Sequence, residues 1–289
     1  MAQVVILTDS AADIDQATRS SLGIEMVPLK VIFGQESFLD SVTMNTQEFF
    51  VKLKGTDVQP TTSQPSPLDF LEAYKQIVEK HGKDVQIICL LLSAALSGTY
   101  QSAVIAKTML EEEIDITIID SKKASFIHGI VTVEAARAVH AGKSKQQILD
   151  LIERLLRDIQ VYFIVDTLEF LQRGGRIGKA QAMLGSLLNI KPILSLDPEG
   201  QVFSFDKVRG TKKAIGRMLE ELTSYAGKDS VKVAILHAEA IDEAKSLLER
   251  VKEEFTVTET FIQELGPVIG THTGPGTLAC VMIKTASYQ

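Results

Sequence analysis

Six short runs rich in Val, Ile and Leu most constrain how this chain can fold. Few charged residues interrupt them, and turn or helix signals bound each one. The runs are residues 4–8, 85–92, 114–119, 161–165, 231–236 and 278–283. Such runs are typical of strands that are buried on both faces, as in α/β proteins with a parallel sheet.

Helical patterns separate these runs. In the best defined one, Ser66 is placed as N-cap, Pro67 is the first helical residue, Asp69 completes a capping box, and Gly82 ends the helix. Further helices are predicted over residues 98–112, 127–141, 144–159, 212–225 and 239–255, and a hairpin over residues 192–205. Alternating strands and helices in the first half predict a parallel sheet with right-handed crossovers. We therefore expect an α/β protein with two domains, residues 1–155 and 156–289.

Composition excludes several classes of protein. The 37 acidic and 30 basic residues give a formal net charge of −7, and the charges are mixed along the chain, which does not favour nucleic-acid binding. Cys89 and Cys280 lie in apolar runs, where buried, inert thiols are expected. No apolar stretch reaches the ~18 residues of a membrane span. We expect no targeting segment and a cytoplasmic location.

The standard catalytic and cofactor motifs are missing from the sequence. There is no GxGxxG fingerprint, and the Gly-Lys pair at 178–179 lacks both the spacing and the hydroxyl of a phosphate loop. The five histidines and two cysteines show no metal-ligand spacing. We therefore predict no metal site, no cofactor and no catalytic residue.

Three segments that we expect to be loops collect hydroxyls and glycines instead. They are residues 60–67, 92–100 and 266–276. Taken singly, Ser66 and Ser97 fit helix caps and Gly274 and Gly276 fit turns, and a nucleophilic Ser97–His272 pair is a further alternative. Taken together, hydroxyls, helix N-terminal amides and one imidazole, without a dense basic cluster, suit a small anion such as a carboxylate.

Six segments resemble the DegV family of bacterial fatty-acid-binding proteins, in the family's order and over nearly the whole chain. They are Thr8-Asp9-Ser10, residues 61–65, residues 96–103, Asp120-Ser121-Lys122, residues 173–177 and His272-Thr273-Gly274. The resemblance implies two α/β domains with one long-chain fatty acid, such as palmitate, in an apolar tunnel between them. It also implies a non-enzymatic binding subunit, which presents the carboxylate to a separate ATP-dependent fatty acid kinase and carries the acyl phosphate.

The resemblance also implies which residues meet the carboxylate. Thr62, Ser97 and His272 are the expected contacts. Further candidates are Thr61, Ser63, Gly98, Thr273 and Gly274. One departure is His128, in a stretch where the family usually has glycine or apolar residues. If that stretch lines the tunnel, its shape changes; the alternative is a buried, satisfied or surface histidine.

Arginines in two turns are candidates for docking the kinase. They are Arg173, Arg176 and Arg209, which form local basic patches in an acidic chain. The alternative is that Arg173 and Arg176 cap a helix or pair with Asp166 and Glu169. A second functional hypothesis is a kinase-type substrate-binding protein or enzyme, in which His272 holds a small keto ligand. A long apolar pocket favours the acyl chain, and a short polar cleft favours the keto ligand.

Overall fold

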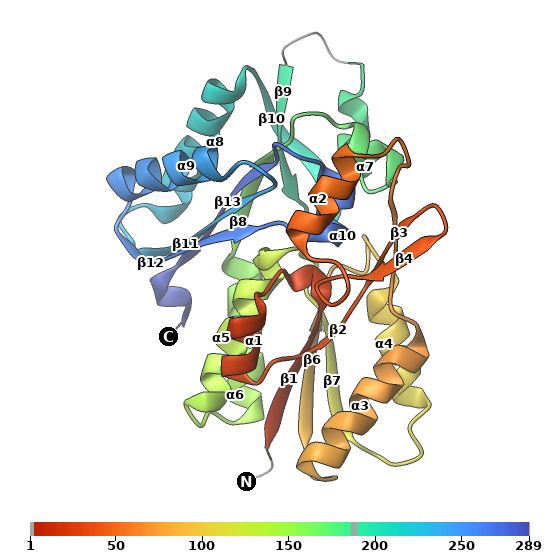
Figure 1. The fold of residues 1–289 in the computed structure, drawn as a ribbon. Coiled ribbons are helices and arrows are strands. Elements are labelled where there is room, and N and C mark those ends of the chain that lie inside the picture. The colour runs from red at the N-terminus through yellow and green to blue at the C-terminus, as the bar shows by residue number, and fades with distance from the viewer. Residues whose placement is uncertain (1–2, 186–189, 289) are drawn as a thin grey trace.

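The N-terminal sheet is four-stranded and parallel, in the order β2-β1-β6-β7. We describe a computed structural model that covers residues 3–185 and 190–288 (Figure 1). The strands are β1 (Val4–Asp9), β2 (Glu25–Val27), β6 (Gln86–Leu91) and β7 (Asp115–Asp120). Three of them lie on the predicted apolar runs, so the predicted parallel sheet is confirmed.

Helices cover both faces of this sheet. They are η1 (Ser10–Ala12), α1 (Gln16–Leu22), α3 (Pro67–His81), α4 (Thr99–Thr108), α5 (Phe126–His140) and α6 (Lys145–Asp158). Val5 and Leu7 pack with α3 and α4, whereas Val4 and Ile6 point to the opposite face, towards α5. Both faces are therefore buried, which explains why the strand carries no alternating polar residues. Helix α3 has the predicted capping box and ends at Gly82.

A small antiparallel sheet, in the order β4-β3-β5, lies beside the parallel one. Its strands are β3 (Lys30–Phe33), β4 (Glu36–Leu39) and β5 (Thr61–Ser63), and α2 (Thr46–Lys54) connects β4 to β5. The prediction of a loop over residues 60–67 is wrong for Thr61–Ser63. Three residues are too few to show strand periodicity, and pairing with β3 makes this segment a strand.

The C-terminal sheet has six strands in the order β10-β9-β8-β13-β11-β12, and only β11 and β12 pair in parallel. The strands are β8 (Gln160–Ile164), β9 (Ile190–Leu196), β10 (Val202–Arg209), β11 (Val231–His237), β12 (Val257–Glu264) and β13 (Leu278–Lys284). The other elements are α7 (Glu169–Arg173), η2 (Gly178–Met183), α8 (Thr211–Ala226), α9 (Ile241–Glu254), α10 (Pro267–Thr273) and η3 (Thr285–Tyr288).

One face of the C-terminal sheet packs against α8 and α9. The other face joins α5 and α6 in a core that spans both halves of the molecule, with Phe163, Leu236 and Val281 contributed by the sheet. The predicted hairpin over residues 192–205 is confirmed by the β9–β10 pair. A domain division at residue 155 stays a prediction; that residue lies within α6, shortly before β8 begins.

The third predicted loop, residues 266–276, is largely a helix. Helix α10 begins with Pro267 in its first turn and ends at Gly274, which has φ 75°. Its hydroxyls bond back to the preceding turn, as in the Thr271 Oγ1 to Pro267 O bond of 2.8 Å. Glycines and threonines disfavour helix in isolation. Tertiary packing against α7 and α2 therefore decides this element.

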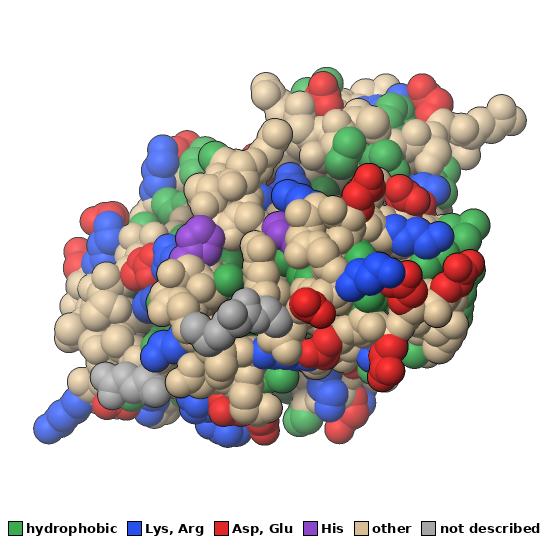
Figure 2. Space-filling view, turned by 90° about the horizontal axis from the view of Figure 1, so that it is seen from below, with side chains coloured by type: hydrophobic (Ala, Val, Ile, Leu, Met, Phe, Trp, Pro, Cys, Tyr) green, Lys and Arg blue, Asp and Glu red, His purple; other side chains and the backbone are tan. Residues whose placement is uncertain are grey.

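Charge and cysteine placement agree with the sequence pattern. Acidic and basic side chains are interspersed on the face shown in Figure 2. Cys89 and Cys280 are free and buried, and burial raises the pKa of the Cys280 thiol to about 12. Among the described residues, no helix is long and apolar enough to cross a membrane.

Candidate functional site

An apolar cavity lies between the two halves of the molecule. The centre of a water-sized sphere can move through about 100 Å³ of this cavity. The total empty space is about 890 Å³ when the open mouth is counted. Most of its described lining is aliphatic or aromatic. The apolar lining residues are Leu29, Leu92, Leu96, Ala124, Ile127, Val161, Phe163, Leu171, Leu196, Val202, Leu236, Leu265, Val268, Ile269 and Ala279.

Polar side chains in the lining come from segments that are far apart in sequence. They are Thr62, Gln64, Ser97, Ser125, Arg176, His272, Thr273 and Thr277. Mostly apolar walls with a few polar groups are typical of small-molecule sites. The lining is also the kind that favours an acyl chain over a small keto ligand.

Thr62 and His272 form a direct pair, although 210 positions separate them. Thr62 Oγ1 lies 2.8 Å from His272 Nε2. Thr62 is the middle residue of β5, and its side chain points into the cavity, whereas Thr61 on the alternate face is exposed. His272 lies in the last turn of α10. Packing of α10 against β5 therefore brings the hydroxyl and the imidazole together.

Ser97 is the third predicted contact and also lines the cavity. It precedes α4, and its Oγ lies 2.9 Å from Thr99 Oγ1. The N-cap of α4 is Gly98, which has no side chain to cap the first amides of the helix. Ser97 therefore precedes the N-cap, although its Oγ accepts the Thr99 N–H at the start of the helix at 3.4 Å. The described hydrogen bonds of Ser97 and His272 go to different partners, so the geometry does not support a nucleophilic pair.

Arg176 is in the cavity wall, where sequence analysis placed no cation. Its Nε donates to Leu96 O at 3.0 Å and its Nη1 to Gly174 O at 2.6 Å. These bonds to carbonyls, rather than to Asp166 or Glu169, hold the guanidinium in place. The expectation of a site without a dense basic cluster therefore stands for the described lining, but the single guanidinium of Arg176 was not foreseen there.

Burial and, to a lesser extent, the nearby Arg176 guanidinium lower the pKa of His272 to about 4. The imidazole is therefore neutral at pH 7. A neutral histidine and a fixed guanidinium give this end of the cavity a positive potential without a second cation. That combination suits a single carboxylate.

The secondary candidates fall into two groups. Thr273 lines the cavity, and its Oγ1 donates to Ile269 O. Ser63, Gly98 and Gly274 flank lining residues but are not part of the described lining. Gln64 was missed, although it lies in the same sequence segment as Thr62. Ser125 and Thr277 were also missed, because no motif marks them.

The three docking candidates lie in different settings. Arg173 is exposed at the end of α7, where it pairs with Glu169 at 3.1 Å and donates to Gln59 at 3.2 Å. Arg173 therefore pairs with Glu169, but at the surface and not inside the fold, and its role in docking stays a prediction. Arg176 belongs to the cavity wall, as described above. Arg209 is exposed at the end of β10.

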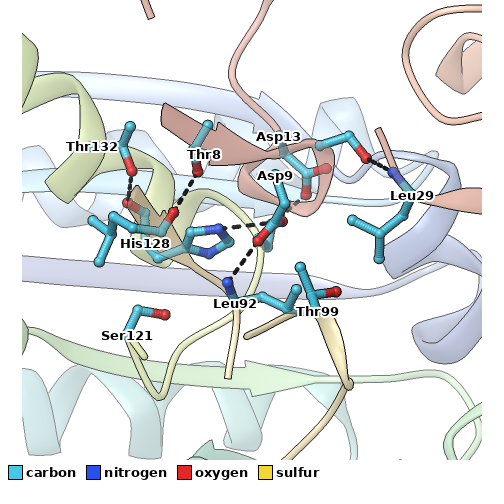
Figure 3. A network of polar contacts seen from close by, with 12 residues as sticks. Thr8, Asp9, Asp13, Leu29, Leu92, Thr99, Ser121, His128 and Thr132 are labelled. Atoms are coloured by element: carbon cyan, nitrogen blue, oxygen red, sulfur yellow. Dashed lines mark hydrogen bonds and ion pairs between the residues drawn. The ribbon is translucent and has the colours of Figure 1, made fainter. Parts of the chain in front are cut away.

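His128 is fully buried on α5 and is not part of the described cavity lining. Its Nε2 lies 3.7 Å from Asp9 Oδ1 (Figure 3), and among the described residues neither of its ring nitrogens has a hydrogen-bond partner. The alternative of a buried histidine outside the described lining is therefore correct, although its ring nitrogens are not satisfied. The stretch does reach the cavity, through Ser125 and Ile127.

Within residues 3–185 and 190–288, no group of three or more His, Cys, Asp or Glu side chains is arranged to hold a metal ion. The polar groups of the cavity are hydroxyls, an amide, an imidazole and a guanidinium. These groups bind anions and hydrogen-bond donors or acceptors rather than hard cations.

Comparisons with known proteins all identify relatives from one family. The family model DegV, described as an uncharacterised protein of the DegV family, matches residues 3–285. A DegV domain-containing protein of Halalkalibacterium halodurans is 37% identical over 279 residues, which is 96% of this chain and 97% of the relative.

Two solved structures are similar over nearly their whole length. One is described as fatty acid binding of a DegV family protein from Thermus thermophilus; it has a TM-score of 0.90 and 37% identity, and the match covers 98% of this chain and 99% of that one. The other is DegV from Bacillus subtilis, described as a fatty acid binding protein, with a TM-score of 0.89, 33% identity and coverage of 99% and 100%. With its parallel N-terminal sheet, its second sheet and the cavity between them, the chain belongs to the DegV family.

Proposed function

We propose that this protein binds one long-chain fatty acid, with the alkyl chain in the apolar cavity and the carboxylate beside Thr62, Ser97 and His272. The observation that carries the proposal is the asymmetry of the cavity. Apolar side chains from both halves form most of the wall, and the Thr62–His272 pair, Ser97 and Arg176 are among its few polar groups. The similar structures from Thermus thermophilus and Bacillus subtilis are described as fatty-acid binding, which supports it.

The two parts of the cavity have different energetic roles. Burial of a long alkyl chain contributes ~0.8 kcal/mol per methylene, on the order of 10 kcal/mol in total before the costs of association. A hydrogen bond to an ionised carboxylate adds only about 1.5–3 kcal/mol. The apolar wall therefore provides most of the affinity, and the polar groups orient the ligand and select for an acid.

In this proposal the protein is a carrier that presents the carboxylate to a separate ATP-dependent kinase and then holds the acyl phosphate. The chain has no phosphate-loop motif of its own. Arg173 lies one residue from Gly174, which contacts the His272 imidazole, so a partner bound at Arg173 would be close to the carboxylate. Arg209, exposed at the end of β10, is a second candidate for docking.

The test is native mass spectrometry of the purified protein, followed by extraction of any bound lipid. We expect bound mass that corresponds to one fatty acid. Titration of lipid-free protein should then show tighter binding of palmitate than of hexadecanol, because the chain is the same and only the acid differs.

A pair of variants controls for the location of the ligand. Ala124→Leu adds volume in the cavity wall and should weaken palmitate binding, whereas Ala94→Leu adds the same volume at an exposed site and should not. Equal affinities of wild type and Ala124→Leu, or no binding of either lipid, would contradict the proposal.

A further inference from the structure

The segment of residues 8–13, at the end of β1 and through η1, is close to the cavity but is not part of its described lining. It includes the Thr8-Asp9-Ser10 motif that sequence analysis singled out. Its polar side chains instead bond to segments that do line the cavity, as the network in Figure 3 shows.

Asp9 and Ser10 each hold one backbone amide of the cavity wall. Asp9 Oδ2 accepts the Leu92 N–H at 2.8 Å, and Ser10 Oγ accepts the Leu29 N–H at 3.0 Å. Ser10 Oγ in turn donates to Asp40 Oδ2 at 2.6 Å. The side chains of Leu29 and Leu92 both line the cavity. Because both residues are buried, each bond satisfies a backbone amide that water does not reach and so fixes its segment in place.

Asp13 holds two further wall segments with one carboxylate. Its Oδ1 accepts the Gly266 N–H at 3.1 Å, and its Oδ2 accepts a hydrogen bond from Ser125 Oγ at 2.5 Å. Gly266 is the N-cap of α10, which carries His272, and Ser125 precedes α5 and lines the cavity. Asp13 thus links the start of α5 in the N-terminal half to the start of α10 in the C-terminal half.

Asp13 and the residues around it are tightly packed. Asp13 is buried in a left-handed conformation, with φ 50° and ψ 33°, which places its side chain between the two helix starts. A Cβ at Gly266 would lie 2.5 Å from Asp13 Oδ1, and a Cβ at Gly129 on α5 would overlap the backbone oxygen of Ala12. Small shifts of Asp13 are therefore transmitted directly to α10 and α5.

We propose that Asp13 is a positioning residue of the ligand site: it fixes the start of α10, and so the place of the His272 imidazole, without touching the ligand. This inference rests on the proposed function for its binding measurements. Loss of the carboxylate would leave the Gly266 N–H and the Ser125 hydroxyl buried without an acceptor, and α10 would shift to satisfy them.

The experiment compares Asp13→Ala with Asp15→Ala. Asp15 is a capping carboxylate two residues away, which accepts the Thr18 N–H at the start of α1, a helix that contributes nothing to the described lining. Both variants lose a helix-start hydrogen bond. We expect Asp13→Ala to bind palmitate at least tenfold more weakly than wild type, and Asp15→Ala to bind it as wild type does.

Two readouts separate positioning from general destabilisation. In a His272→Ala background, Asp13→Ala should weaken palmitate binding less than threefold, because the imidazole it positions is already gone. In the lipid-free protein, Asp13→Ala should shift the ¹H–¹⁵N resonances of the His272 ring, and Asp15→Ala should not. Asp13→Asn keeps the size, the tolerance for left-handed backbone and one acceptor, so it should fold and show a smaller change in the same direction.

The outcomes distinguish this inference from the proposed function. Wild-type protein that does not bind palmitate would contradict the proposed function, while the His272 resonances of the lipid-free variants would still test Asp13. Unchanged His272 resonances in Asp13→Ala, or in Asp13→Asn if the alanine variant does not fold, would overturn the inference. Equal losses of affinity with and without His272 would also overturn it.

Discussion

Replacement of Gly174 by alanine should damage the ligand site while leaving the fold intact. Gly174 follows α7 with φ −72° and ψ −10°, a conformation that alanine adopts readily. An added Cβ would lie 2.8 Å from Cε1 of His272 and closer still to Nδ1. The imidazole would have to rotate away, and its 2.8 Å contact with Thr62 Oγ1 would break.

The expected magnitudes follow from this geometry. Overlap with a side chain costs about 1–3 kcal/mol, and the loss of glycine's freedom in the unfolded chain returns about 0.4–1 kcal/mol. The net loss of folding stability should thus be on the order of 1 kcal/mol. Without the imidazole as partner, the carboxylate loses about 1.5–3 kcal/mol of binding free energy, which corresponds to roughly 10- to 150-fold weaker binding.

The assay measures palmitate and hexadecanol affinities alongside the free energy of unfolding. Gly174→Ala should weaken palmitate binding and leave hexadecanol binding nearly unchanged, because the alkyl chain keeps its wall. Gly175→Ala is the matched control: Gly175 has φ +69° and no heavy atom within 4 Å of an added Cβ. It should lose stability through backbone strain and keep wild-type affinity.

A Gly174→Ala variant that retains the wild-type preference for the acid over the alcohol would contradict this prediction. Equal losses of palmitate affinity in the two variants would also contradict it, since backbone strain alone would then explain both results.

Three further predictions concern the head group, the buried carboxylates and the partner. Thr62→Val and Ser97→Ala should each reduce acyl phosphate formation, assayed with a kinase and ATP, by about 1–3 kcal/mol, and should reduce palmitate binding by less. Equal losses in both assays would contradict separate roles for the alkyl chain and the head group. Burial raises the pKa of Asp40 from 3.8 to about 6, so the folded state binds more protons than the unfolded state between these values, and the free energy of unfolding should fall as pH rises through that window. Asp40→Asn should remove this loss of unfolding free energy, which is on the order of 3 kcal/mol. The measurement is denaturant titration at pH 4 and pH 7, and an equal change in unfolding free energy for wild type and Asp40→Asn would refute the prediction. Charge reversal at Arg173 or Arg209 should leave the melting temperature and palmitate affinity unchanged but slow phosphorylation, because an exposed pair such as Arg173–Glu169 adds little stability; a variant that unfolds or loses its lipid would show a structural role.

Local sequence determined the scaffold of this protein. The apolar runs that became β1 and β6 specify strands buried on both faces, whereas the run that became β7 forms a half-buried strand at the edge of the sheet. Ser66, Pro67 and Asp69 specify the start of α3, because a cap is satisfied by residues within one turn. These features depend on neighbours along the chain, so they can be read without a structure.

The tertiary structure alone decided the details of the site. Most residues of helix α10, which include one glycine, two threonines, a valine and an isoleucine, do not favour helix, and its start is held by Asp13, 253 positions away. The Thr62–His272 contact and the bond from Arg176 to Leu96 O join segments separated by 210 and 80 positions. Family resemblance identified Thr62, Ser97 and His272 as candidates, but no local pattern shows that Arg176 lines the cavity or that His128 does not. Their orientations follow from long-range packing, in which burial and hydrogen bonding override the weak preferences of short segments.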